Sequence, residues 1–337
     1  MIPRDAPFAH VQRLSDDVGI FEHATGAVPE RHHGYCVDDV ARALLVVGRE
    51  REPDAELCDL AVRYLDFVVC AQGPDGRSRN RLGLDRRWRD EPGLLDCWGR
   101  ALWALGTTAA RGHSPAQRKR ARDHFALAAG QRSPYVHAMA FAGLGAAEVL
   151  AVVPADRRAR ALLAAAAAAI GHPGPAGTSW PWPWPRLEYA NAAIPEVLVA
   201  AGELLGDARA LDDGLRLLRW LLDEQTLDGH LSVVPVGGRG PGDGPPGFDQ
   251  QPIEVAALAD ACARAWRVTG DPRFASGLEL AIGWFLGDND ASCPLYDPQT
   301  HGGFDGLTRE GCNTNQGAES TLAMVATLQH ARDLVPR

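Results

Sequence analysis

The chain has 337 residues, 46% of them hydrophobic and 23% charged, and its formal net charge at pH 7 is −9. This composition suffices for a sizeable core, and the negative charge argues against non-specific binding to nucleic acids or membrane surfaces. No basic stretch followed by an apolar core opens the sequence, and the longest apolar run, 161–171, is short and alanine-rich. The seven cysteines form no Cys-x-x-Cys pair, so we expect a cytoplasmic protein without a membrane partner.

Apolar residues recur at helical spacing almost throughout the chain. Six segments are apolar nearly all round: 38–48, 94–107, 135–151, 188–205, 250–268 and 315–331. Five amphipathic segments alternate with them: 54–71, 115–129, 155–170, 208–224 and 272–286. A helix that is apolar on every side is buried, whereas an amphipathic helix covers a core. The alternation therefore predicts six inner helices and five to six outer ones.

The connections alternate as well, because inner-to-outer links are short and outer-to-inner links are often long. The long ones are 72–93, 171–187, 226–249 and 287–314. We predict an all-α fold, an (α/α)6 toroid of helical hairpins, forming a single domain over residues 1–337. Residues 1–30 would be an N-terminal segment closing the toroid at the sixth outer position. An open α-solenoid is the alternative, but solenoid repeats are more evenly spaced.

Each inner segment begins with a cluster of polar or aromatic side chains. The clusters are 35–39, 96–98, 135–137, 188–191, 249–251 and 313–316. Hairpin connectivity places all six, together with the long loops, at the same end of the molecule. Because buried polar groups are costly unless they are satisfied, we expect them to converge on one wet pocket.

Asp38 and Asp39 are the strongest candidates for chemistry. Adjacent residues at a helix start point about 100° apart, so one can cap the helix while the other enters a cavity. Glycoside hydrolysis needs two carboxyl groups, and a partner should come from another inner helix. Glu319 and Asp249 qualify as catalytic partners, and Glu254 qualifies by position. The alternative is that these carboxylates only cap helices or pair with neighbours.

Aromatic, histidine and arginine residues near the same end are candidates for substrate binding. The sequence WPWPWP at 180–185 alternates tryptophan with proline. Its stiffly held tryptophans would stack on sugar faces. The alternative is that burial of the tryptophans only fixes the loop in place. Arginines of the loop 76–91 would hold an anionic substrate, or else form a solvated surface. A lid formed by 301–305 would close over the site. The predicted binding residues are Tyr35, Arg86, Arg87, Asp96, His137, Trp182, Trp184, Tyr189, Asn191, Gln250, His301, Asp305, Asn315 and Gln316.

Three segments carry a family resemblance: HGYCVDDVARALL, DRRWRDEPGLLDCWGRALWALG and NTNQGAESTLA. They resemble α/α-toroid carbohydrate-active proteins, a group with glycoside hydrolases, unsaturated uronyl hydrolases and N-acylglucosamine 2-epimerases. More closely, they resemble a poorly characterised bacterial family found beside, or fused to, glycosyltransferases and sometimes labelled as such. Nearly the whole chain is covered, although Val40 stands where that family usually has asparagine. The resemblance implies an oligosaccharide or glycoside ligand and a glycosyltransferase as a further partner.

The preferred hypothesis is a glycoside hydrolase that uses a carboxylate acid/base pair and needs no metal or cofactor. No dinucleotide, phosphate-loop or zinc-protease motif occurs in the sequence. The first alternative is a sugar epimerase or isomerase, in which two histidines such as His137 and His301 face each other across the sugar. The second is a non-catalytic glycan-binding domain of a glycosyltransferase system. Phosphorolysis, with phosphate held by arginines, also stays open.

Overall fold

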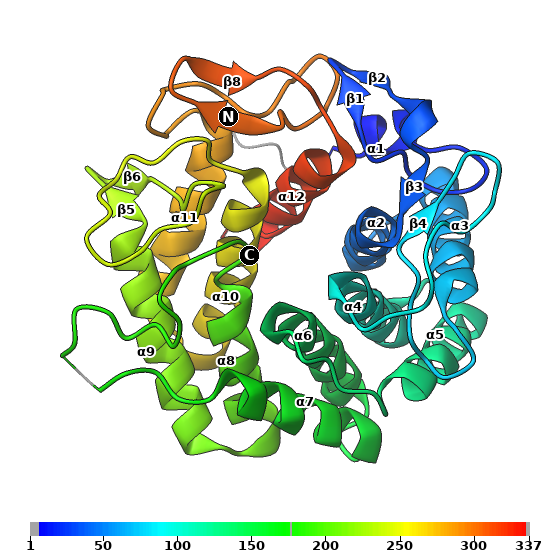
Figure 1. Cartoon of the computed structure of the whole chain (residues 1–337), viewed down its shortest axis with the longest axis horizontal. Coiled ribbons are helices and arrows are strands. Elements are labelled where there is room, and N and C mark those ends of the chain that lie inside the picture. Colours follow the sequence, from blue (N-terminus) through cyan, green and yellow to red (C-terminus); the bar gives the residue numbers. More distant parts are fainter. Residues whose placement is uncertain (1–6, 176, 335–337) are drawn as a thin grey trace.

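The computed structural model describes residues 7–175 and 177–334. Within this part, a closed ring of inner helices surrounds the axis of the molecule (Figure 1). Each inner helix contacts the next one along the chain, and the last contacts the first. The ring consists of α2 (Val37–Arg49), α4 (Asp96–Arg111), α6 (Val136–Val152), α8 (Ala193–Leu205), α10 (Pro252–Thr269) and α12 (Ala318–Gln329).

Outer helices pack against the ring, each on the inner helix that precedes it. The predicted (α/α)6 toroid is therefore confirmed. The short helices α1 (Ala9–Arg13) and α13 (Ala331–Leu334) contact α12, which has no long outer partner in the described residues. Residues 1–6 of the predicted closing segment lie outside the described residues. The outer helices are α3 (Ala55–Ala71), α5 (Pro115–Ala128), α7 (Arg157–Ile170), α9 (Ala208–Glu224) and α11 (Pro272–Leu286).

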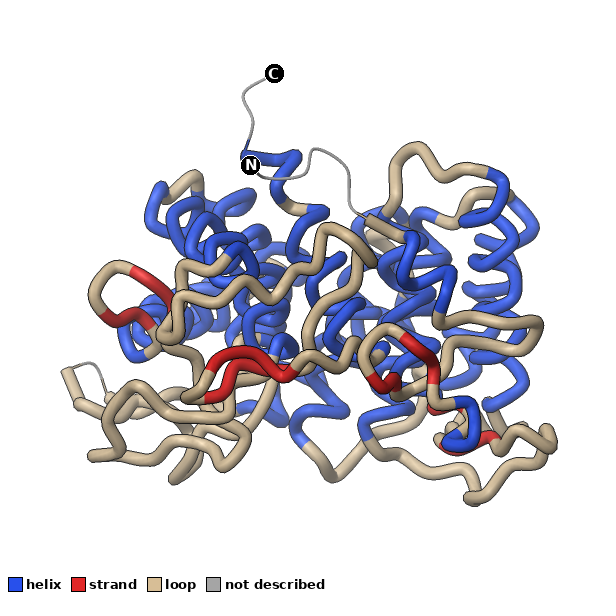
Figure 2. Tube along the Cα trace, turned by 90° about the horizontal axis from the view of Figure 1, so that it is seen from above, coloured by secondary structure: helices blue, strands red, loops and turns tan. Residues whose placement is uncertain are grey.

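Short antiparallel strand pairs, which the sequence did not predict, occur in the segments that lead into inner helices. Figure 2 shows that the strands and long loops gather toward one side of the ring. The 3-10 helix η1 (Arg31–His33) lies on the same N-terminal segment as the first pair. The pairs are β1 (Ala24–Thr25) with β2 (Val28–Pro29), β3 (Tyr35–Cys36) with β4 (Arg81–Leu82), β5 (Thr226–Leu227) with β6 (His230–Leu231), and β7 (Gly306–Thr308) with β8 (Gly311–Asn313).

Small residues let the inner helices approach closely. A Cβ on Gly106 of α4 would lie 2.1 Å from the carbonyl oxygen of Gly145 in α6. A Cβ on Gly99 would lie 2.2 Å from the carbonyl oxygen of Ala138. The α4–α6 contact therefore depends on glycine at these positions.

Among the described residues, none of the helices combines the length and the apolar character that crossing a bilayer requires.

Candidate functional site

A cavity of about 530 Å³ lies at the N-terminal ends of the inner helices. Its position is the one predicted for the polar helix starts, and the inner helices α2, α4, α10 and α12 contribute to it. Six carboxylates and three arginines line it, so the wall is strongly charged. The lining residues are Glu22, His23, Cys36, Asp38, Asp39, Arg42, Arg81, Asp96, Arg100, Tyr189, Gln251, Ile253, Asp305, Asn313, Gly317, Glu319 and Ser320.

Inner and outer helices differ in whether a side chain caps the helix start. Outer helices start with side-chain caps, such as Asp54 on α3, Asp207 on α9 and the capping box of Ser114 with Gln117 on α5. None of the six described inner helices has a side-chain cap at its start. The carboxylates at these starts are therefore not used as caps and are directed to other partners.

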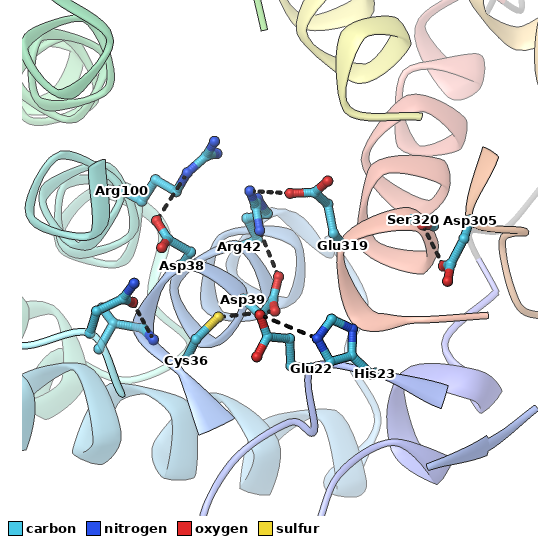
Figure 3. Close-up of polar contacts among 12 residues, drawn as sticks. Glu22, His23, Cys36, Asp38, Asp39, Arg42, Arg100, Asp305, Glu319 and Ser320 are labelled. Atoms are coloured by element: carbon cyan, nitrogen blue, oxygen red, sulfur yellow. Dashed lines mark hydrogen bonds and ion pairs between the residues drawn. The ribbon is translucent and has the colours of Figure 1, made fainter. Parts of the chain in front are cut away.

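Arg42 connects two of the predicted catalytic carboxylates. Its Nη1 donates to Oδ1 of Asp39 at 2.6 Å, and its Nη2 donates to Oε2 of Glu319 at 2.6 Å. Figure 3 shows the guanidinium lying between the two side chains. Asp39 and Arg42 share one face of α2 because they are three residues apart, while Glu319 comes from the start of α12. One guanidinium thus joins the first and last inner helices.

Asp39 and Glu319 have contrasting environments. The side chain of Asp39 is 4% exposed, whereas that of Glu319 is 39% exposed. Burial raises the pKa of Asp39 to about 6, against the opposing effect of Arg42 and with a further contribution from the Glu319 charge. The Cys36 thiol donates a hydrogen bond to Oδ2 of Asp39 at 3.1 Å. A carboxyl whose pKa is raised toward neutral pH, beside a more accessible carboxyl group, is an arrangement suited to acid/base catalysis.

Asp38 points to a different neighbour. Its Oδ1 is 3.3 Å from Nε of Arg100, one turn into α4. Arg100 is 6% exposed, and its guanidinium lies 4.0 Å from the ring centroid of Phe141. Burial lowers the pKa of Arg100. Its terminal nitrogens have no hydrogen-bond partner among the described residues, so they are available to a ligand in the cavity.

A polar stack closes the side of the cavity next to α4. The Tyr189 hydroxyl donates to Oδ2 of Asp96 at 2.5 Å, and the Tyr189 ring stacks on His137 at a centroid distance of 4.3 Å. His137 is buried behind this tyrosine, and burial lowers its pKa. Tyr189 and Asp96 therefore face the cavity, while His137 supports them from behind.

On the opposite wall, Asp305 is held in place by the start of α12. Its Oδ1 accepts hydrogen bonds from the Gly317 amide at 2.8 Å and the Ser320 hydroxyl at 2.7 Å. The predicted lid residue thus lines the cavity, whereas His301 contacts Tyr296 edge-on and does not line it.

The tryptophan run packs on an outer helix and does not form a platform in the cavity. Trp182 is 5% exposed and stacks with Trp220 of α9, and Trp180 meets the same ring edge-on. Trp182 and Trp184 contact each other at 5.8 Å. Burial of these large rings pins the loop, which is the alternative that the sequence had left open.

Other predicted residues are occupied in local structure or lie outside the cavity. Tyr35 donates to Asp16, and Asn191 binds Glu254, whose pKa burial raises to about 7. Asp249 is exposed and does not line the cavity. The remaining side chains make contacts elsewhere: Gln250 with Asp290 and Trp284, Asn315 with the Gly26 amide, Gln316 with Thr300 and Asp297, and Arg86 with Asp17, while Arg87 is exposed.

Sequence reasoning missed the cations of the site. Arg42 and Arg100 each lie one turn inside an apolar helix, four residues after Asp38 and Asp96 respectively. A charged residue at that depth needs a partner, which was the available signal. Arg81 lines the cavity from the arginine loop and pairs with Glu22, in contrast to the predicted Arg86 and Arg87.

One group in the cavity has the donor atoms for a metal ion. Oxygens of Glu22 and Asp39 and the Cys36 sulfur all lie within 4.8 Å of one another. Arg81 and Arg42 already neutralise the two carboxylates. Two fixed guanidinium charges beside these donors oppose the entry of a dication.

The sequence matches no family model and no curated protein. Solved structures, however, resemble this chain over nearly its whole length. A sugar epimerase from a ruminal bacterium matches with a TM-score of 0.71 at 12% identity, covering 98% of this chain and 96% of its own. Cellobiose 2-epimerase from Spirochaeta thermophila matches with a TM-score of 0.69 at 13% identity, covering 97% and 92%.

A GH76 α-mannanase from Bacteroides thetaiotaomicron matches with a TM-score of 0.64 at 9% identity, covering 96% of this chain and 92% of its own. The two epimerases thus match the chain with somewhat higher TM-scores than the glycan hydrolase. At these identities the likeness concerns the fold and does not extend to a reaction. The chain has the (α/α)6-toroid fold that is shared by these carbohydrate-active proteins.

Proposed function

We propose that this protein is a carbohydrate-active enzyme and, more specifically, a glycoside hydrolase. The large polar cavity at the inner helix starts supports a hydroxyl-rich ligand, because its wall offers carboxylate, guanidinium, amide and phenol groups. The carbohydrate-active proteins with the same fold support the same substrate class. The ligand is a glycoside or an oligosaccharide.

The observation that carries the reaction assignment is the pair of unlike carboxyl groups joined by Arg42. Asp39, whose pKa burial raises to about 6, acts as the proton donor to the glycosidic oxygen. Glu319, which is accessible, takes a proton from the water that attacks the anomeric carbon. The C–O bond to the leaving group breaks as this water adds. Asp38, Asp96 and the terminal nitrogens of Arg100 remain to bind hydroxyl groups.

Epimerisation by two histidines has less support. That chemistry needs an acid and a base on opposite faces of the sugar carbon. In the described part of the chain, His23 is the one histidine that lines the cavity, whereas His137 is covered by Tyr189.

The direct test is a screen of mannosides, glucosides and uronides, with and without phosphate, followed by kcat/KM measurements on the best substrate. Asp39→Asn and Glu319→Gln should each lower kcat/KM by about 10²–10⁴-fold. Asp249→Asn is the matched control, since this exposed carboxylate lies outside the cavity, and it should behave as wild type. Near-normal turnover in both cavity variants would refute the assignment, and glycan binding without any turnover would identify a binding domain.

A further inference from the structure

Three histidines gather at the rim of the cavity, on the N-terminal segment that carries Glu22 and His23 into it. His32 and His33 belong to η1, and their rings are 4.1 Å apart between centroids. The His23 ring meets His33 edge-on at 4.7 Å. Neither His32 nor His33 lines the catalytic cavity, so the proposed hydrolysis does not use them.

A carboxylate completes this group. Oε2 of Glu30 is 3.1 Å from Nε2 of His33. The ligand atoms of Glu30, His32 and His33 all lie within 4.8 Å of one another. The Thr25 hydroxyl donates to the other Glu30 oxygen, which orients the carboxylate toward the histidines. Hydrogen bonds of this kind from outside the ligand set are typical of metal sites.

We propose that Glu30, His32 and His33 form a Zn²⁺ site at the rim of the cavity. Two imidazoles and one carboxylate are a donor set that zinc accepts, with a fourth position open to an oxygen ligand. Neutral imidazole and carboxylate ligands match a borderline ion better than Mg²⁺, which prefers oxygen donors. A bound metal ion would also coordinate both of the closely packed imidazoles, those of His32 and His33.

The surroundings of Glu30, His32 and His33 favour metal binding more than those of the Glu22, Cys36 and Asp39 group inside the cavity. The side chains of Glu30 and His33 are 32% and 41% exposed, so an ion can reach them and they can adjust to it. The nearby arginines are engaged elsewhere. Arg31 lies over the Phe21 ring at 5.2 Å, Arg89 pairs with Asp85 at 2.8 Å, and Arg81 pairs with Glu22. The Glu22, Cys36 and Asp39 group, in contrast, has a guanidinium on each carboxylate.

Zinc at this site would act on the cavity through the chain segment. The β1–β2 hairpin, η1 and the two cavity residues Glu22 and His23 follow one another within residues 22–33. An ion bound by Glu30, His32 and His33 would fix this segment and thereby the rim. The site is independent of the reaction that is proposed for the cavity.

The test is a calorimetric titration of the full-length, tag-free protein with ZnCl₂, repeated in excess MgCl₂. We expect one Zn²⁺ per chain, no competition from Mg²⁺, and a rise in Tm on binding. His32→Ala, His33→Ala and Glu30→Gln should each weaken zinc binding by about tenfold or more. His172→Ala is the matched control, because this exposed histidine pairs with Asp213 and belongs to neither donor group, so it should bind zinc as wild type does.

Cys36→Ser changes the donor group inside the cavity and leaves Glu30, His32 and His33 intact, so it should leave the zinc affinity unchanged. Absence of zinc binding at micromolar concentrations would overturn the proposal. So would wild-type affinity in the three rim variants, or a loss of binding in Cys36→Ser alone. Circular dichroism of each variant shows whether it is folded. Folding is the expected result, because His32 and His33 are exposed and Glu30 is half-buried.

Discussion

Arg42 stabilises the protein by neutralising a buried carboxylate as well as by joining two helices. Its side chain is 16% exposed and that of Asp39 is 4% exposed, so their ion pair is largely shielded from water. Removing one partner of such a pair leaves an uncompensated buried charge, and this typically costs about 3–5 kcal/mol. The same guanidinium also holds Glu319. The site and the stability of the ring therefore depend on the same residue.

Arg42→Met should accordingly lower the free energy of unfolding by about 3 kcal/mol at pH 8. Urea denaturation measures this loss. The double variant Asp39→Asn, Arg42→Met should recover part of it, because the unpaired charge is gone. If Arg42→Met were as stable as wild type, the buried ion pair would not exist as described.

The pH dependence follows from Asp39. As the proton donor it must be protonated, so kcat/KM should fall as the pH rises through about 6. The free energy of unfolding should also fall as the pH rises, because the pKa of Asp39 is raised in the folded state. The favourable contribution of Asp39 to the free energy of unfolding is complete below the pKa that this carboxyl has in the unfolded chain. It is lost as the pH rises through about 6. Asp39→Asn should therefore gain stability relative to wild type from pH 4 to pH 8, and equal pH profiles of the two proteins would contradict this.

Some of the residues that the sequence singled out line the cavity. Asp38, Asp39 and Glu319 line the cavity because helix starts aim polar side chains toward a common end. Gln251 lines it where Gln250 was expected, because adjacent side chains at a helix start point in different directions. Glu22 and His23 come from the irregular N-terminal segment, whose path has no periodic signal.

At the scale of the elements, the close contact between inner helices is the property most sensitive to substitution. Gly106→Ala should destabilise the protein by about 1–3 kcal/mol, because its new Cβ would overlap the backbone of Gly145. Gly48→Ala is the matched control within α2, where the nearest atom is 3.6 Å from an added Cβ. The control should be neutral or more stable by about 0.5–1 kcal/mol. Thermal and urea unfolding measure both, and equal effects would contradict tight α4–α6 packing.

Helices were predictable from the sequence, and strands were not. The predicted segments 208–224 and 272–286 coincide with α9 and α11, whose starts carry the caps Asp207 and Asp271. The strand pairs hold two or three residues per strand, too few for an alternating pattern to emerge. The tryptophan loop shows a second limit, since neighbouring prolines and rings do not reveal which surface they cover.

At the scale of the whole molecule, each end of the toroid has its own charged cavity. A second cavity of about 520 Å³ lies at the other end, where Arg49, Glu196, Asp260 and Arg264 form part of its wall. Arg49 binds Asp260 through two hydrogen bonds of 2.7 and 3.3 Å. A narrow apolar cavity of about 60 Å³ shares residues with both larger cavities. The Arg49–Asp260 ion pair thus connects two inner helices, α2 and α10, at this end of the toroid.

Arg49→Met should therefore cost about 3 kcal/mol in the free energy of unfolding while leaving kcat/KM near its wild-type value. Urea denaturation and steady-state kinetics on the same preparation give both quantities. A fall in kcat/KM similar to that of Glu319→Gln, without loss of stability, would place chemistry at the far end.

In the proposed reaction, Asp39 and Glu319 hydrolyse a glycosidic bond in the cavity at the inner helix starts. The most direct measurement follows the best glycoside by NMR in D₂O with wild type, Asp39→Asn and Glu319→Gln. We expect wild type to release free sugar with no deuterium on carbon, and both variants to release little or none. Carbon-bound deuterium in the recovered sugar, or full release by both variants, would contradict it.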